Sequence, residues 1–220
     1  MAELTYPFLS ASRLRMSTDG EGVTTLVAGA GCPLSCKYCI NRNVLQKAPT
    51  AITAQELFQK VKIDDLYFQA TGGGITFGGG EALLHAPFIR EFRALIKNRW
   101  RIHAETSLYV PREHVDIAAQ CVDSFIVDIK DMDPLIYLSY TEKEATLAHE
   151  NLLHLKDLVG PERILVRLPL IPKYNTEANQ AHSAEVLRSL GFTRLDLFRY
   201  IIRSDNAELI IENYRKRELP

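Results

Sequence analysis

Short strand-like runs alternate with longer helical runs along most of the chain, and this alternation is the feature that most constrains the fold. The short runs are rich in β-branched and apolar residues, whereas the segments between them carry apolar residues at helical spacing. Strands that alternate with helices predict a parallel sheet with helices outside it. The alternation alone does not decide whether this sheet closes. The predicted strands are Val23–Ala28, Gly74–Phe77, Ile102–Thr106, Ser124–Ile129, Ile164–Leu170 and Arg194–Tyr200.

Capping residues mark where two of the intervening helices begin. Thr53 is followed three residues later by Glu56, which is the spacing of a capping box. Pro111 suits the start of another helix, because proline is tolerated in a first turn. Three further helices are predicted at Pro87–Asn98, Thr146–Leu158 and Ala178–Leu190.

The chain contains no internal repeat and no Gly/Ser-rich or Pro-rich segment long enough to separate domains. We expect a single domain over residues 1–220, with a core at about 17–200 and a C-terminal tail at 201–220. A net charge of −1 argues against binding to nucleic acid or to an anionic membrane, since both usually require a basic excess. The first residues do not resemble a signal peptide, and no apolar stretch has the length of a membrane helix. A cytoplasmic location is therefore expected.

Chemically distinctive residues stand at the ends of four predicted strands. The first strand leads into a cysteine-rich loop, and the second ends in a glycine run followed by Glu81. Glu105 and Thr106 close the third strand, and Asp128–Lys130 closes the fourth. Because parallel sheets bind ligands at the carboxyl ends of their strands, we expect these residues to share one site.

Three cysteines lie in this first loop, with the spacing Cys-x3-Cys-x2-Cys, and a fourth, Cys121, lies far away in the chain. Thiolates are soft ligands that suit iron–sulfur clusters and zinc. A structural zinc site uses four ligands, usually in two close pairs, whereas this loop offers three. Zinc with Cys121 or a histidine as the fourth ligand is the alternative, although Cys121 is expected to be a buried core thiol. The candidate metal ligands are Cys32, Cys36 and Cys39.

This cysteine spacing, with Tyr38 before the last cysteine, resembles the radical SAM superfamily. Within it the chain is similar to the activating enzymes of glycyl radical enzymes, the pyruvate formate-lyase activase-like family. Asp19–Gly22 resembles that family's Asp-Gly-Pro-Gly stretch, and Gly72–Glu81 resembles its Gly-Gly-Val-Thr-Phe-Ser-Gly-Gly-Glu. Asp128-Ile129-Lys130 matches the family's Asp-x-Lys, and Arg167 lies in a matching late strand.

The resemblance implies a partial (β/α)6 barrel with a 4Fe–4S cluster on the three cysteines at its open top. The cluster would bind S-adenosylmethionine (SAM) and cleave it reductively to a 5′-deoxyadenosyl radical, which is an anaerobic oxidoreductase chemistry. The implied partner is a glycyl radical enzyme, from which the radical would abstract a hydrogen of a backbone glycine. Two alternatives are a radical SAM enzyme acting on another peptide or a small metabolite, and a non-catalytic zinc or iron–sulfur module.

The resemblance also implies roles for individual residues. Glu81 is the candidate for orienting the SAM ammonium, directly or through neighbouring backbone, and Lys130 joins the cysteines as a catalytic residue by pairing with the SAM carboxylate. Arg167 either contacts that carboxylate or makes an ion pair across the barrel. Tyr38 would place loop backbone against the adenine. The implied cofactor-binding residues are Tyr38, Ile40, Gly78, Gly79, Gly80, Glu81, Glu105, Asp128, Ile129, Lys130 and Arg167.

Other expectations concern additional ligands. A monovalent cation can lie beside SAM in this family, and Glu105, Thr106, Ile126 and Asp128 occupy the matching places, with Glu105 where aspartate is usual. An acidic electron donor, flavodoxin or ferredoxin, is expected to dock near the basic residues around the cysteine loop, for which a solvated face is the alternative. These basic residues are Lys37, Arg42 and Lys47.

The chain departs from the family pattern at several positions. Glu21 and Thr24 replace the proline and arginine of the family's Asp-Gly-Pro-Gly-x-Arg stretch, and Gly78 stands where serine is common. Asp19 is interpreted either as a contact for an incoming glycine loop or as part of a simple turn. The last strand is expected to end in Tyr200-Ile201, where relatives carry a histidine near the SAM adenine.

Overall fold

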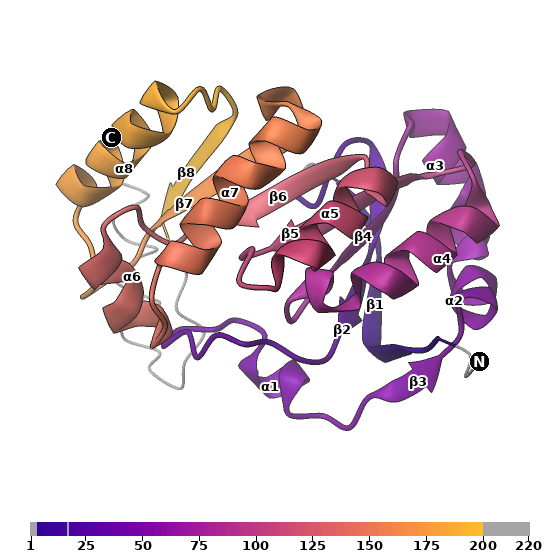
Figure 1. Ribbon diagram of the computed structural model, residues 1–220. Coiled ribbons are helices and arrows are strands. Elements are labelled where there is room, and N and C mark those ends of the chain that lie inside the picture. Colours follow the sequence, from indigo (N-terminus) through magenta and orange to yellow (C-terminus); the bar gives the residue numbers. More distant parts are fainter. Residues whose placement is uncertain (1–3, 17, 200–220) are drawn as a thin grey trace, which may run out of the picture.

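The computed structural model describes residues 4–16 and 18–199, and within them eight strands form one sheet (Figure 1). The strand order is β3-β1-β2-β4-β5-β6-β7-β8, so the sheet is open, with β3 and β8 at its edges. The strands are β1 Tyr6–Met16, β2 Val23–Gly29, β3 Thr50–Ile52, β4 Gly74–Gly79, β5 Arg101–Thr106, β6 Ser124–Asp128, β7 Ile164–Leu170 and β8 Leu195–Arg199.

Six of these strands, β2 and β4 to β8, are parallel and follow one another in chain order. They correspond to the six predicted strands, so the expectation of a parallel sheet with helices outside it is confirmed, and the sheet is open, as a partial barrel requires. Two strands were not predicted from the sequence, β1 and β3, which pair in antiparallel fashion at one edge. Much of β1 is exposed, and its residues show no apolar alternation. The strand is held by its backbone hydrogen bonds to β2 more than by burial of side chains.

Helices connect the parallel strands, and the predicted capping box is present. Thr53 Oγ1 accepts from Glu56 N at 3.2 Å, while the Glu56 carboxylate accepts from Thr53 N at 2.8 Å. The α-helices are α1 Arg42–Leu45, α2 Ala54–Val61, α3 Asp65–Thr71, α4 Ala86–Ile96, α5 Arg112–Cys121, α6 Pro134–Thr141, α7 Thr146–Val159 and α8 Glu177–Ser189. Short 3-10 turns lie at Lys62–Asp64, Ala82–His85 and Pro161–Arg163.

The apolar core lies between one face of the sheet and the helices that cover it. Figure 1 shows α4, α5 and α7 lined up along this face. Ile75 and Phe77 of β4, like Phe125 and Val127 of β6, are fully buried in the core. Residues between them in sequence point to the opposite face, because side chains alternate along a strand. That face carries polar residues, which include Thr76, His103, Glu105, Asp128 and Arg167.

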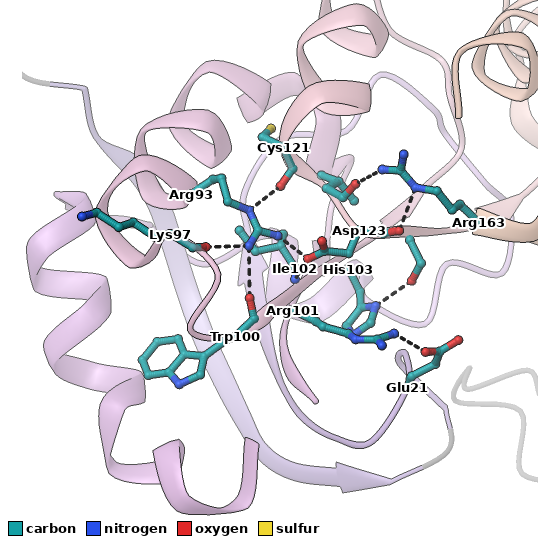
Figure 2. Close-up of polar contacts among 12 residues, drawn as sticks. Glu21, Arg93, Lys97, Trp100, Arg101, Ile102, His103, Cys121, Asp123 and Arg163 are labelled. Carbon is teal, nitrogen blue, oxygen red and sulfur yellow. Dashed lines mark hydrogen bonds and ion pairs between the residues drawn. The ribbon is translucent and has the colours of Figure 1, made fainter. Parts of the chain in front are cut away.

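Arg93 fastens α4 to the amino-terminal end of this sheet (Figure 2). Its guanidinium donates to the carbonyls of Cys121 at 2.9 Å, Lys97 at 2.8 Å and Trp100 at 3.1 Å. It also pairs with Asp123, whose carboxylate accepts from Ile102 N at 2.6 Å. Cys121 is buried, as expected for a core thiol. The amino-terminal end of the sheet is therefore held together by contacts within the protein. The candidate site lies at the carboxyl end.

No helix in the described part of the chain combines the length and the apolar character that a membrane-spanning segment needs.

Candidate functional site

The loop that carries the three cysteines follows β2 at the carboxyl end of the sheet. All three thiols are free; Cys32 is exposed, and Cys36 and Cys39 are half-buried. The carboxyl end of α6 holds this loop, since the carbonyls of Thr141 and Tyr140 accept from Ser35 N and Lys37 N, each at 3.1 Å. The loop is thus fixed to a helix that comes about a hundred residues later in the chain.

The chemistry of the donor set fits a cubane cluster. Burial, the largest cause, raises the pKa of Cys36, while nearby Lys130 lowers it. A thiol with a raised pKa loses its proton readily only when it binds a metal cation such as iron. Among the described residues, no three Cys, His, Asp or Glu side chains gather around a point where one ion would bind. A four-iron cluster takes one thiolate per iron, so three cysteines on one loop can serve as its protein ligands.

The glycines at the end of β4 and directly after it lie against the cysteine loop. Gly80 N donates to Gly29 O at 3.0 Å, and Glu81 N donates to Gly31 O at 2.8 Å. A Cβ at Gly80 would collide with the Gly31 carbonyl, and Gly79 has a φ of 91° that favours glycine. A Cβ at Gly78 would lie 2.9 Å from a Glu105 carboxylate oxygen. At Gly79 and Gly80, glycine is therefore required by the close approach of the protein's own backbone.

Glu81 is buried, with 2% of its surface exposed, and its carboxylate is saturated by protein donors. One oxygen accepts from Thr106 Oγ1 at 2.5 Å and from Leu83 N at 3.0 Å. The other accepts from Ser107 N at 2.8 Å and Ser107 Oγ at 2.6 Å. Glu81 thus ties the turn after β4 to the end of β5. Glu81 would therefore act on a ligand by positioning this backbone, since its carboxylate already accepts hydrogen bonds from the protein.

Asp128 and Lys130 lie together at the end of β6. Lys130 Nζ is 3.2 Å from Asp128 Oδ2, and Lys130 has a φ of 67°, which is unusual for a residue with a side chain. Ile129 between them is fully buried. The neighbouring Asp131 is 1% exposed and accepts from Ser183 Oγ at 2.7 Å and Asn175 Nδ2 at 2.9 Å. Sequence reasoning missed Asp131, although a second aspartate directly after Asp-x-Lys was a visible signal.

Arg167 makes the ion pair that was one of its two predicted roles. It lies 3.1 Å from Glu105 and 3.5 Å from Asp196 of β8, and it donates to Thr18 O at 2.9 Å. Burial raises the pKa of Glu105, as does Asp128, while Arg167 opposes this rise. Asp196 was not singled out in the sequence, because nothing near position 196 reveals that β8 pairs with β7.

The polar side chains that were expected to bind a monovalent cation make hydrogen bonds or ion pairs with other residues of the protein. Thr106 donates to Glu81, Glu105 pairs with Arg167, and Asp128 pairs with Lys130. Ile126 is buried.

Aromatic side chains surround the rest of the cysteine loop. The Tyr38 ring meets Tyr174 edge-on at 5.7 Å and lies 6.3 Å from Tyr140. Ile40 is 53% exposed. Two of the three basic residues have partners in the protein: Lys37 pairs with Glu142, and Arg42 donates to the carbonyls of Cys36 and Lys37, each at 3.0 Å. Lys47 is exposed.

Asp19 is buried in the structure and pairs with Arg15, while its carbonyl accepts from Thr76 Oγ1. These contacts hold the turn in place. The predicted Tyr200-Ile201 pair and the tail at 201–220 lie outside the described residues.

The comparisons with known proteins agree with this arrangement. The chain is 32% identical over 144 residues to the (2S)-3-sulfopropanediol dehydratase activating enzyme of Klebsiella oxytoca, covering 64% of this chain and 45% of that protein. It is 28% identical over 182 residues to the pyruvate formate-lyase 1-activating enzyme of Escherichia coli K12, covering 80% of this chain and 72% of that protein. The chain thus spans about half the length of the Klebsiella relative it matches.

A crystal structure of a radical SAM methyltransferase from Sphaerobacter thermophilus has the same fold. Its TM-score is 0.60 at 18% sequence identity, and the match covers 98% of this chain and 76% of that one. The family model of the radical SAM superfamily matches residues 26–182, a span that begins in β2 and ends within α8. Since this match includes the cysteine loop and most of the parallel sheet, the chain belongs to the radical SAM superfamily.

Proposed function

We propose that the chain binds a 4Fe–4S cluster through Cys32, Cys36 and Cys39, cleaves SAM, and activates a glycyl radical enzyme by removing hydrogen from a backbone glycine. The observation that carries this proposal is the loop of three free cysteines seated on the glycine turn after β4. The similarity to two named activating enzymes supports the choice of target. The described residues share one sheet and one core, which supports a single domain.

In this proposal, some residues of the chain bind SAM and others position the backbone around it. When bound, the cluster and SAM supply the electron and the adenosyl radical for hydrogen abstraction. Lys130 offers an ammonium group to the SAM carboxylate, and Asp128, its present partner at 3.2 Å, keeps that group at the sheet edge. Glu81 positions the backbone under the cysteine loop. Tyr38 and the exposed Ile40 extend this surface toward the adenine.

The electron comes, in this proposal, from a flavodoxin or a ferredoxin. The exposed Lys47 is the most available of the three basic residues near the loop, because Lys37 and Arg42 have partners within the protein. We do not extend the proposal to a monovalent cation, since Glu105 and Asp128 already pair with cationic side chains.

The decisive experiment combines the anaerobically reconstituted, reduced protein with SAM and candidate glycyl radical enzymes. A glycyl radical signal in electron paramagnetic resonance is the expected result. SAM cleavage without this signal for any candidate would favour another peptide or a small metabolite as the substrate. One zinc per chain with no iron would refute the enzymatic proposal and favour a structural metal-binding module.

A further inference from the structure

Tyr137 of α6 is fully buried, yet its hydroxyl has no hydrogen-bond partner among the described residues. A buried polar group without a partner costs free energy, and most buried groups in native proteins avoid this cost. Phenylalanine would fill the same space without the penalty. The hydroxyl therefore calls for an acceptor that the polypeptide itself does not supply.

The position of Tyr137 places it next to the cysteine loop. The helical turn that begins at Tyr137 ends at Thr141, whose Oγ1 donates to Tyr137 O at 2.8 Å. The carbonyls of Tyr140 and Thr141 in the same turn accept from the backbone of the loop at Lys37 and Ser35. One turn of helix thus carries both the unpartnered hydroxyl and the contacts that hold the cysteine loop.

The surroundings of the side chain point in the same direction. Its ring packs edge-on against His149 of α7, with the ring centroids 5.7 Å apart. Burial is the main cause that raises the pKa of Tyr137, while Lys130 lowers it and Cys36 and Glu81 raise it further. The hydroxyl therefore lies within the electric field of groups from the cysteine loop and from the ends of β4 and β6.

The neighbouring groups leave one strong acceptor. The ammonium of Lys130 only donates hydrogen bonds. The oxygens of Glu81 already accept four hydrogen bonds from protein groups. Tyr109, which also raises the pKa of Tyr137, has a phenol that is only a neutral acceptor, and hydrogen bonds to charged acceptors are roughly twice as strong. Cys36 becomes such a charged acceptor when it ligates a metal, because the ligand is the thiolate.

We propose that the Tyr137 hydroxyl donates a hydrogen bond to the Cys36 thiolate when the loop holds its cluster, and that this bond raises the cluster's reduction potential. The inference rests on the proposed cluster site. Hydrogen bonds to the sulfurs are among the factors that set the potential of an iron–sulfur cluster. The bond favours the reduced form, because the reduced cluster carries one more negative charge on its sulfurs.

The test is a redox titration of the reconstituted protein without SAM, followed by electron paramagnetic resonance, for wild type and Tyr137→Phe. The expected result is about a tenfold shift toward the oxidised form at a fixed potential, which is about 59 mV more negative for one electron. Tyr6→Phe is the matched control, because Tyr6 is equally buried and its hydroxyl donates instead to Val27 O at 3.4 Å. Its potential should equal that of wild type.

A second readout uses the metal-free protein. There Tyr137→Phe should melt no lower than wild type, since the hydroxyl that is lost has no protein partner. If Tyr137→Phe does not fold, 3-fluorotyrosine at position 137 gives a more acidic donor and should shift the potential to more positive values.

Several results would overturn the inference. An unchanged potential in Tyr137→Phe would do so, as would a shift that occurs only with SAM present, which would make SAM the acceptor. A lower melting temperature of the metal-free variant with an unchanged potential would assign the hydroxyl a structural role. Iron analysis of wild type comes first, because absence of iron there refutes the proposed function itself, and the inference with it.

Discussion

Replacing Glu81 by glutamine separates a structural role of this carboxylate from direct binding of SAM. Glutamine keeps the shape of the side chain but exchanges one acceptor oxygen for an NH2 group. In the structure both oxygens face donors: Thr106 and Leu83 on one side and Ser107 on the other. In either orientation the amide nitrogen of the glutamine therefore meets one backbone N–H that it cannot accept from, while the hydroxyl beside it can rotate and accept instead.

The size of the effect follows from these contacts. One hydrogen bond is lost, and the three that remain lose the negative charge of the Glu81 carboxylate. Hydrogen bonds to charged groups contribute about 1.5–3 kcal/mol and neutral ones about 0.5–1.5 kcal/mol, so Glu81→Gln should lower the free energy of unfolding by about 4.5–7.5 kcal/mol. For a domain of this size, that corresponds to a fall of about 9–30 °C in melting temperature.

The assay is thermal unfolding of the metal-free protein, followed by circular dichroism. Glu150→Gln serves as the control, because Glu150 is exposed and its nearest basic partner, Arg112, is 3.9 Å away. Its melting temperature should match that of wild type. A fall of less than about 2 °C for Glu81→Gln, combined with loss of SAM binding, would refute the reasoning, since the carboxylate would then serve the ligand directly.

Three further predictions concern other parts of the chain. Cys36→Ala should lower the iron content and abolish SAM cleavage, and retained cleavage would contradict the ligand assignment. Burial lowers the pKa of His103 from 6.5 to about 4. The unfolded chain therefore takes up the proton first, and the free energy of unfolding should fall by up to about 3 kcal/mol between pH 6.5 and 4. Urea titrations across this range would measure the fall. If the free energy of unfolding of His103→Gln fell equally with pH, the fall would not come from His103. Arg93→Met should destabilise the metal-free protein by about 2–3 kcal/mol, because three backbone carbonyls lose their donor. The exposed Arg90 on the same helix provides the control Arg90→Met, and equal melting temperatures for the two variants would argue against this network.

Most of the parallel strands could be predicted because the apolar residues of their buried face leave a local trace in the sequence. Ile164–Leu170, for example, is apolar except at Arg167, and the observed strand has the predicted bounds. The edge strand β1 has no such trace. Five consecutive residues from Ser10 to Leu14 are exposed, and its pairing with β2 includes irregular register. Its stability comes from hydrogen bonds to a neighbour, which a pattern of side chains does not encode.

The candidate site shows the same division between local and distant information. The cysteine spacing is a local pattern, and it led to the superfamily that the family model matches. The partners of Glu81, by contrast, come from Thr106 and Ser107, 25 and 26 residues further along the chain. The sequence therefore pointed to Glu81 but suggested a role in orienting the SAM ammonium. The donors that saturate its carboxylate come together only in the folded sheet.

Arg167 illustrates how the neighbours of a residue decide between two chemical roles. Its sequence context allowed either a contact with the SAM carboxylate or an ion pair across the sheet. In the fold, carboxylates stand on both sides of it, Glu105 from β5 and Asp196 from β8. A SAM carboxylate at this position would have to compete with two anions already fixed on β5 and β8, and for a guanidinium that is already paired the gain in free energy is small. The two ion pairs account for Arg167, and in the proposed function the contact with the SAM carboxylate is assigned to Lys130, which lies beside Asp128 at the end of β6.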